Sequence, residues 1–202
     1  MRLATLPVLV GALAALAPAG ANGASATRTQ TYSPFDSSGQ FTLRPELRIT
    51  ESVGGECEMG SFFSATGYRC FGGPSRNGNT IFDPCCAQGD PATGDVQALI
   101  CPTRVTSNTV TEVQTGESLT PIRRPVRRTP WSVTVGGGRT CSIFGGASAL
   151  WRGQRINYAC SGKGRRFLVG LPSTATKRWT ITMVTGADGR RGRRVAIVNA
   201  WY

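Results

Sequence analysis

Few residues of this 202-residue chain could carry out acid–base or covalent chemistry, because the sequence contains no histidine. A Ser-His-Asp triad, a Cys-His pair and a histidine-bound metal are therefore all excluded. What remains is chemistry by carboxylates, lysine or tyrosine, together with seven cysteines. We identify no catalytic residue, no metal site and no cofactor motif, and we expect no enzymatic activity.

Four acidic residues are the candidates for catalysis by carboxylates: Glu51, Glu56, Glu58 and Asp83. Two carboxylates at a suitable separation can hydrolyse a glycoside. Nothing in the sequence sets that separation, and solvated acids along a strand edge are the simpler interpretation. A carboxylate-based hydrolase of cell-envelope glycans is kept as an alternative function.

The cysteines predict disulfides rather than a metal–thiolate site, because the chain has neither Cys-x-x-Cys nor histidine. Cys141 and Cys160 lie apart from the other cysteines and pair most simply with each other. Closing the loop between them would stabilise the fold by about 3 kcal/mol.

The other five cysteines lie between residues 57 and 101, so one of them is left without a partner within this group. Adjacent Cys85 and Cys86 rarely bond to each other, because the small ring is strained. We favour Cys86 as the unpaired residue. The preferred pairing is then Cys57–Cys70 with Cys85–Cys101, although two other connectivities fit the spacing as well.

The N-terminus has the pattern of a secretory signal peptide. A basic Met1-Arg2 precedes an apolar stretch from Leu3 to Ala17, and cleavage sites follow at Ala19-Gly20-Ala21 and at Ala24-Ser25-Ala26. We predict a signal peptide over 1–21, cleaved near residue 21 or 26, and a secreted product with no transmembrane helix. An N-terminal anchor is the alternative, but the apolar stretch is shorter than the roughly 20 residues that span a bilayer.

Charge is divided unevenly along the chain. Six arginines accompany ten acidic residues from Thr27 to Glu117, whereas sixteen basic residues accompany one acid, Asp188, from Ser118 to Tyr202. In a β fold, basic turns can gather at one end and add their fields. The arginine pairs of the second half are candidate polyanion-binding residues: Arg123, Arg124, Arg127, Arg128, Arg165, Arg166, Arg190, Arg191, Arg193 and Arg194.

The basic half predicts attraction to anionic envelope polymers or lipid head groups, with no nucleic acid as a physiological partner. Tryptophans could add stacking on sugars, although positions in the core are the simpler interpretation for each of them: Trp131, Trp151, Trp179 and Trp201. Two plainer interpretations of the charge are solvated loops that keep the protein in solution and pairing between the acidic and basic halves.

Hydrophobic alternation and turn residues predict a mainly β chain with little helix outside the signal peptide. We expect a flexible lead-in over 22–45, a Cys-rich subregion of loops and strands over 46–120, an Arg/Pro connector over 121–130 and a basic antiparallel β subregion over 131–202. Strands are expected in the last subregion over 131–135, 140–144, 149–159, 167–171, 179–184 and 195–201.

Short words around the cysteines carry a resemblance. They are Tyr68-Arg69-Cys70-Phe71, Asn79 to Cys85, Ala98 to Pro102, Thr140-Cys141, Arg155 to Cys160 and Ala200-Trp201-Tyr202. Together they resemble uncharacterised secreted proteins and lipoproteins of high-GC actinobacteria, over roughly residues 46–202. The resemblance implies an exported, envelope-associated protein with two small disulfide-stapled antiparallel β subregions, and it implies no catalytic residues.

The chain departs from that pattern at Cys86, where an aromatic residue is usual, in its Arg-rich connector, and in lacking a lipid-accepting cysteine near the N-terminus. Our first expectation is a non-catalytic, exported protein that binds through its basic half. The glycan hydrolase is the alternative. A secreted inhibitor or effector, with the 121–130 connector as its protruding loop, is a lesser one.

Overall fold

The computed structural model is built from β-strands, and no helix occurs in the part of the chain that it describes. The predicted mainly β fold with disulfide-stapled subregions is confirmed. The predicted signal peptide over 1–21 lies outside the described part. The described residues are 25–38, 40–73, 80–96, 98–116, 118–122, 129–144, 146, 148–186, 189 and 191–202.

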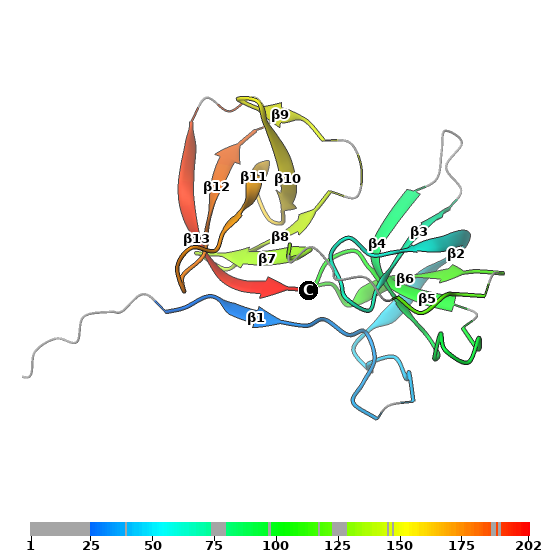
Figure 1. Cartoon of the computed structure of the whole chain (residues 1–202). Helices are drawn as coiled ribbons and strands as arrows, with labels where there is room; N and C mark the ends of the chain where they lie inside the picture. Colours follow the sequence, from blue (N-terminus) through cyan, green and yellow to red (C-terminus); the bar gives the residue numbers. More distant parts are fainter. Residues whose placement is uncertain are drawn as a thin grey trace, which may run out of the picture.

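The first half of the chain closes into a barrel of five strands, each paired with the next (Figure 1). Its strands are β2 (Arg48–Gly60), β3 (Tyr68–Gly72), β4 (Thr80–Ala87), β5 (Ala98–Pro102) and β6 (Thr109–Gln114). Antiparallel neighbours reverse direction at every step, so an odd number of strands brings the first and last strands together in parallel. The β2–β6 pairing is parallel for this reason.

Two disulfides lie in the core of the first barrel. Cys57–Cys70 joins β2 to β3, and Cys85–Cys101 joins β4 to β5. These are the preferred pairs of the sequence analysis, and Cys86 is the free cysteine. Burial raises the pKa of the Cys86 thiol to about 12, which keeps it protonated and weakly nucleophilic at neutral pH.

The second half closes into a barrel of six strands, and here the even number makes the closing pair antiparallel. The barrel strands are β7 (Ser132–Val135), β8 (Arg139–Ile143), β10 (Gln154–Cys160), β11 (Arg166–Ser173), β12 (Thr180–Thr185) and β13 (Gly192–Trp201). A short strand, β9 (Leu150–Trp151), forms a hairpin with the start of β10. All six predicted strands of this subregion are therefore confirmed within a few residues.

Side chains of the second barrel alternate between two cores, as expected for a strand period of two. On β12, Ile181 and Met183 belong to the interior core, whereas Val184 packs outside with Trp151 of the β9 hairpin. The Cys141–Cys160 disulfide lies in the interior and joins β8 to β10.

Part of the expected flexible lead-in over 22–45 is ordered. Strand β1 (Arg28–Gln30) pairs in parallel with β13, and the Thr27 hydroxyl donates a hydrogen bond to the carbonyl of Ile197. Farther along, Phe35 and Leu43 pack against a small core of the first barrel. The short polar strand β1 is thus ordered by backbone pairing, and the rest of the segment by packing of its few apolar side chains.

The connector over 121–130 is anchored at both ends. Ile122 packs against the core of the first barrel, and the Pro130 carbonyl accepts a 2.8 Å hydrogen bond from the buried Tyr158 hydroxyl of the second. Residues 123–128 of this connector, which was expected to form a protruding loop over 121–130, lie outside the described part. Among the described residues no helix is long and apolar enough to cross a membrane.

Candidate functional site

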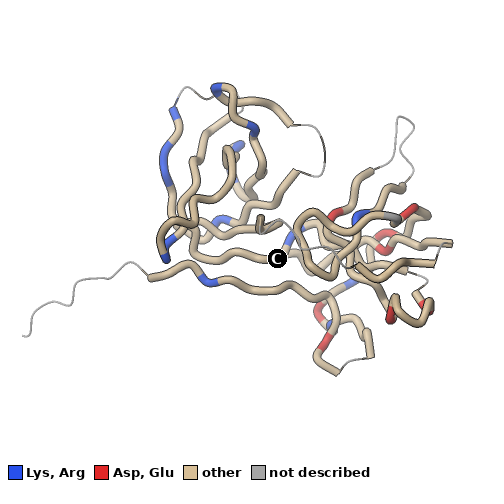
Figure 2. The backbone as a smooth tube through the Cα atoms, in the orientation of Figure 1, with Lys and Arg blue, Asp and Glu red and all other residues tan. Residues whose placement is uncertain are grey.

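The second barrel carries a strongly basic surface. Its described part contains no acidic residue, and Figure 2 shows Lys and Arg distributed over it while the Asp and Glu residues lie on and around the first barrel. The described basic residues are Arg139, Arg152, Arg155, Lys163, Arg165, Arg166, Lys177, Arg178, Arg191, Arg193 and Arg194.

Five of the ten predicted polyanion-binding residues fall in the described part, near one end of the second barrel: Arg165, Arg166, Arg191, Arg193 and Arg194. The other five lie outside it: Arg123, Arg124, Arg127, Arg128 and Arg190.

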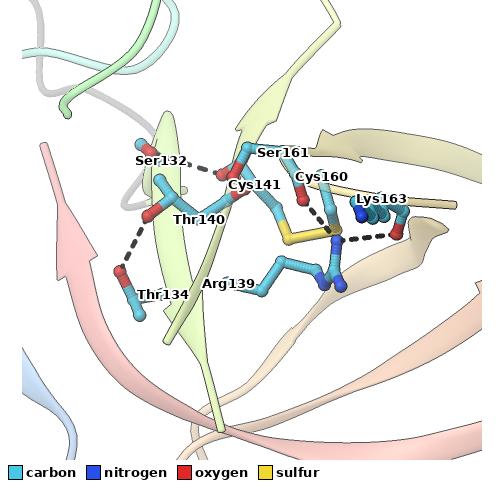
Figure 3. The surroundings of a disulfide bond; sticks show 8 residues. All are labelled: Ser132, Thr134, Arg139, Thr140, Cys141, Cys160, Ser161 and Lys163. Atoms are coloured by element: carbon cyan, nitrogen blue, oxygen red, sulfur yellow. Dashed lines mark hydrogen bonds between the residues drawn. A yellow bond between two sulfur atoms is a disulfide. The ribbon is translucent and has the colours of Figure 1, made fainter. Parts of the chain in front are cut away.

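Neighbouring turns bring this group of basic residues together. The Gly186 N–H, after β12, donates a 2.7 Å hydrogen bond to the Arg165 carbonyl, before β11. On the other side, the Arg139 guanidinium donates to the carbonyls of Ser161 and Lys163, next to the Cys141–Cys160 disulfide (Figure 3). The loop between β10 and β11 therefore links the start of β8 to the turn between β12 and β13.

Charge pairing does not join the two barrels among the described residues. Both ion pairs formed between described residues belong to the N-terminal half: Arg44 with Glu46 at 3.4 Å, and Arg69 with Asp83 at 3.8 Å. In the second barrel, Arg155 donates to Ser148 and to the Gly146 carbonyl. Among the described residues, no ion pair therefore links the basic second barrel to the acidic half of the chain.

Three of the four tryptophans are buried in a core or packed against one. Trp131 is 2% exposed and makes an edge-to-face contact with Tyr32 at 5.3 Å. Trp151 lies over Gly192, donates to the Gly189 carbonyl and carries the Arg152 guanidinium on its ring. Trp179 and Trp201 are half-buried. The core interpretation is therefore the better one for Trp131, Trp151 and Trp179.

The candidate hydrolase carboxylates do not converge among the described side chains. Glu51 and Glu56 are both exposed on β2, five residues apart, which corresponds to about 16 Å along a strand. That exceeds the roughly 5 to 10 Å between the carboxylates of a glycosidase. Asp83 is fully buried in its side chain, and the side chain of Glu58 lies outside the described part.

Asp83 is held by groups of its own barrel. Its carboxylate accepts hydrogen bonds from the Ser61 hydroxyl and, at 3.3 Å, from the Phe62 N–H. Burial raises the Asp83 pKa to about 6, which outweighs the opposite effects of these bonds and of Arg69. Arg69 also lies under the Phe62 ring, 4.5 Å from its centroid. This cluster fixes the loop after β2.

A pocket of about 740 Å³ lies between the barrels. Phe62, Phe63 and Arg69 line it from the first barrel, and Phe144 and Arg155 from the second. Its apolar walls and two guanidinium groups make it a secondary candidate for a ligand with an apolar body and a negative charge.

Sequence reasoning missed Arg139, because it stands alone and we selected arginine pairs. A period-two signal could have found it. Arg139, Arg166 and Arg193 each precede an apolar interior residue by two positions: Cys141, Leu168 and Val195. This spacing places all three on the inward-facing side of their strands.

Comparison with protein families, with curated proteins and with solved structures finds no match to this chain. The resemblance to actinobacterial secreted proteins and lipoproteins therefore stays a prediction, and the function is argued from the surface itself.

Proposed function

We propose that this chain is an exported, non-catalytic protein that binds anionic polymers or lipid head groups of the cell envelope through its second barrel. The observation that carries the proposal is the charge of that barrel: eleven described basic residues with no described acid among them. Such a surface creates a field that concentrates polyanions near it.

The proposed location rests on two features. The N-terminal sequence has the pattern of a signal peptide, and six of the seven cysteines form disulfides, which fit an oxidising compartment outside the cytoplasm. Nucleic acid would satisfy the same electrostatics, but in the proposed location the available polyanions are phosphate polymers, acidic glycans and anionic lipids.

The test is retention of the mature chain on cell-wall fragments and on phosphatidylglycerol vesicles across a salt series. Binding that releases counterions weakens steeply with ionic strength, so we expect strong retention at about 50 mM salt and loss at about 500 mM. Neutral phosphatidylcholine vesicles are the control. Retention that does not change with salt, or none at low salt, would contradict the proposal.

A further inference from the structure

One end of the second barrel carries an arginine on every second strand. Strands β8, β11 and β13 run in the same direction, because each is separated from the next by one antiparallel strand. All three begin at the same end of the barrel. Arg139 and Arg166 are the first residues of β8 and β11, and Arg193 is the second residue of β13.

All three arginines occupy inward-facing register positions. Arg139 pairs with Val135 and Arg193 pairs with Met183, and both partners belong to the interior core. Arg166 precedes the interior residue Leu168 by two positions. Directly paired residues share a face of the sheet, so the three side chains start toward the barrel axis.

The barrel order distributes these arginines evenly. In the closed order β7, β8, β10, β11, β12, β13, the arginine strands alternate with strands that carry none at this end. Neighbouring strands lie about 4.8 Å apart, so alternate strands are about 10 Å apart. Three long side chains that start at this separation and point inward can reach one central ion.

The surroundings favour a bound anion. The next layer of the interior contains Leu168, Met183 and the Cys141–Cys160 disulfide, which together form an apolar surface below the three arginines. Like charges at such distances repel, and no described residue of this barrel is acidic. Arg139 is already oriented by its bonds to the carbonyls of Ser161 and Lys163 (Figure 3).

We propose that Arg139, Arg166 and Arg193 form a site for a single phosphate group. Guanidinium groups bind phosphate oxygens in pairs and keep their charge, and here Arg139 and Arg166 are half-buried while Arg193 is exposed. The inference deepens the proposed function and rests on it: the phosphate would belong to an envelope polymer or to a lipid head group.

The test compares two neighbouring arginines of β13 that differ in the face they occupy. Arg193 occupies an inward-facing register position opposite Met183, whereas Arg194 pairs with Thr182 on the outer face and donates to the Thr180 hydroxyl. Arg193→Gln and Arg194→Gln remove the same charge. We measure the Kd of the mature chain for soluble inorganic polyphosphate at about 100 mM salt.

We expect Arg193→Gln to weaken polyphosphate binding about tenfold, as loss of a charge-assisted pair does, and Arg194→Gln to weaken it about twofold. Arg166→Gln should match Arg193→Gln, and Arg166→Lys, which keeps the charge but not the paired donors, should lie between it and the wild type. Circular dichroism and thermal unfolding verify that each variant folds.

Equal losses for the Arg193 and Arg194 variants would overturn the phosphate site while leaving salt-dependent retention, and hence the proposed function, intact. A wild type that binds no anionic ligand at low salt would overturn both. Repeating the comparison on phosphatidylglycerol vesicles separates the sources: a larger Arg193 effect on vesicles than on polyphosphate assigns the site to lipid, and the reverse assigns it to a soluble polymer.

Discussion

At the scale of single residues, Asp83 is the one deeply buried carboxylate among the described residues, and its role is structural. Asp83 receives the Ser61 hydroxyl and lies near Arg69, yet its burial still raises its pKa to about 6. A carboxyl with a raised pKa is stabilised as the neutral acid in the folded state. The folded protein therefore retains a proton that the unfolded chain releases at lower pH.

This predicts a stability change that is specific to Asp83. Between about pH 4 and pH 6 the folded state binds more protons than the unfolded state, so the free energy of unfolding falls as pH rises through this window. A shift from the usual 3.8 to about 6 corresponds to about 3 kcal/mol. Urea unfolding of the wild type and of Asp83→Asn from pH 4 to pH 7 should show the wild type losing about this much relative to the variant.

The exposed residue Asp95 provides the control. Asp95→Asn removes the same charge from an exposed position and is the charge-matched control. If Asp83→Asn and the wild type showed parallel pH profiles, the raised pKa of Asp83 would be wrong.

At the scale of strands, period-two alternation together with turn residues was sufficient to predict the strands of the second barrel. Ile181 and Met183, or Val133 and Val135, are visible in the sequence as inward positions. Strand β1 was not visible, because Arg28–Gln30 is short and polar and its order comes from pairing with residues of β13 that lie 171 positions farther along the chain. Local pattern carries no information about such a pairing.

The same limit applies to the candidate site. Paired arginines were found because they are adjacent in sequence, whereas the set of Arg139, Arg166 and Arg193 depends on which strands run in the same direction. The disulfides Cys57–Cys70 and Cys85–Cys101 were favoured correctly, because strand neighbours in a simple up-and-down order are also sequence neighbours.

Strands β2 and β3 provide a prediction about close packing. A Cβ at Gly72 would lie 2.5 Å from the Gly54 carbonyl oxygen, whereas a Cβ at Gly54 would meet no atom within 4 Å. We expect Gly72→Ala to lower the free energy of unfolding by about 2 to 3 kcal/mol, because the two backbones must separate. Gly54→Ala should change it by less than about 0.5 kcal/mol. Denaturant unfolding of both variants measures the difference, and equal values would contradict the close approach.

At the scale of the whole molecule, the segment over 27–47 connects the barrels. It begins with β1 on β13 and ends in the small core that contains Leu47 and Ile100 of the first barrel. Between them Tyr32 is 8% exposed, packs on Trp131 and donates its N–H to the Tyr202 carbonyl. Both predicted cleavage sites precede this segment, so processing at either would retain it.

Removing the Tyr32 ring should therefore loosen this segment from the second barrel. We expect Tyr32→Ala to lower the free energy of unfolding by about 3 kcal/mol, the usual cost of emptying a large buried aromatic site. Tyr32→Phe keeps the ring and its contact with Trp131, so it should retain most of the stability. Calorimetry of the two variants compares them, and a Tyr32→Ala protein as stable as the wild type would show that Tyr32 does not anchor this segment.

The even number of strands in the second barrel also determines which end of it stays accessible when the protein is immobilised through its C-terminus. In an up-and-down barrel of six strands, the chain enters and leaves at the same end. Figure 1 shows the C-terminus between the two barrels. Strands β8, β11 and β13 begin at the opposite end. A chain immobilised through Tyr202, on a sensor chip or as a fusion, would therefore present its three arginines to the bulk solution. An affinity tag attached at Tyr202 would not obstruct them.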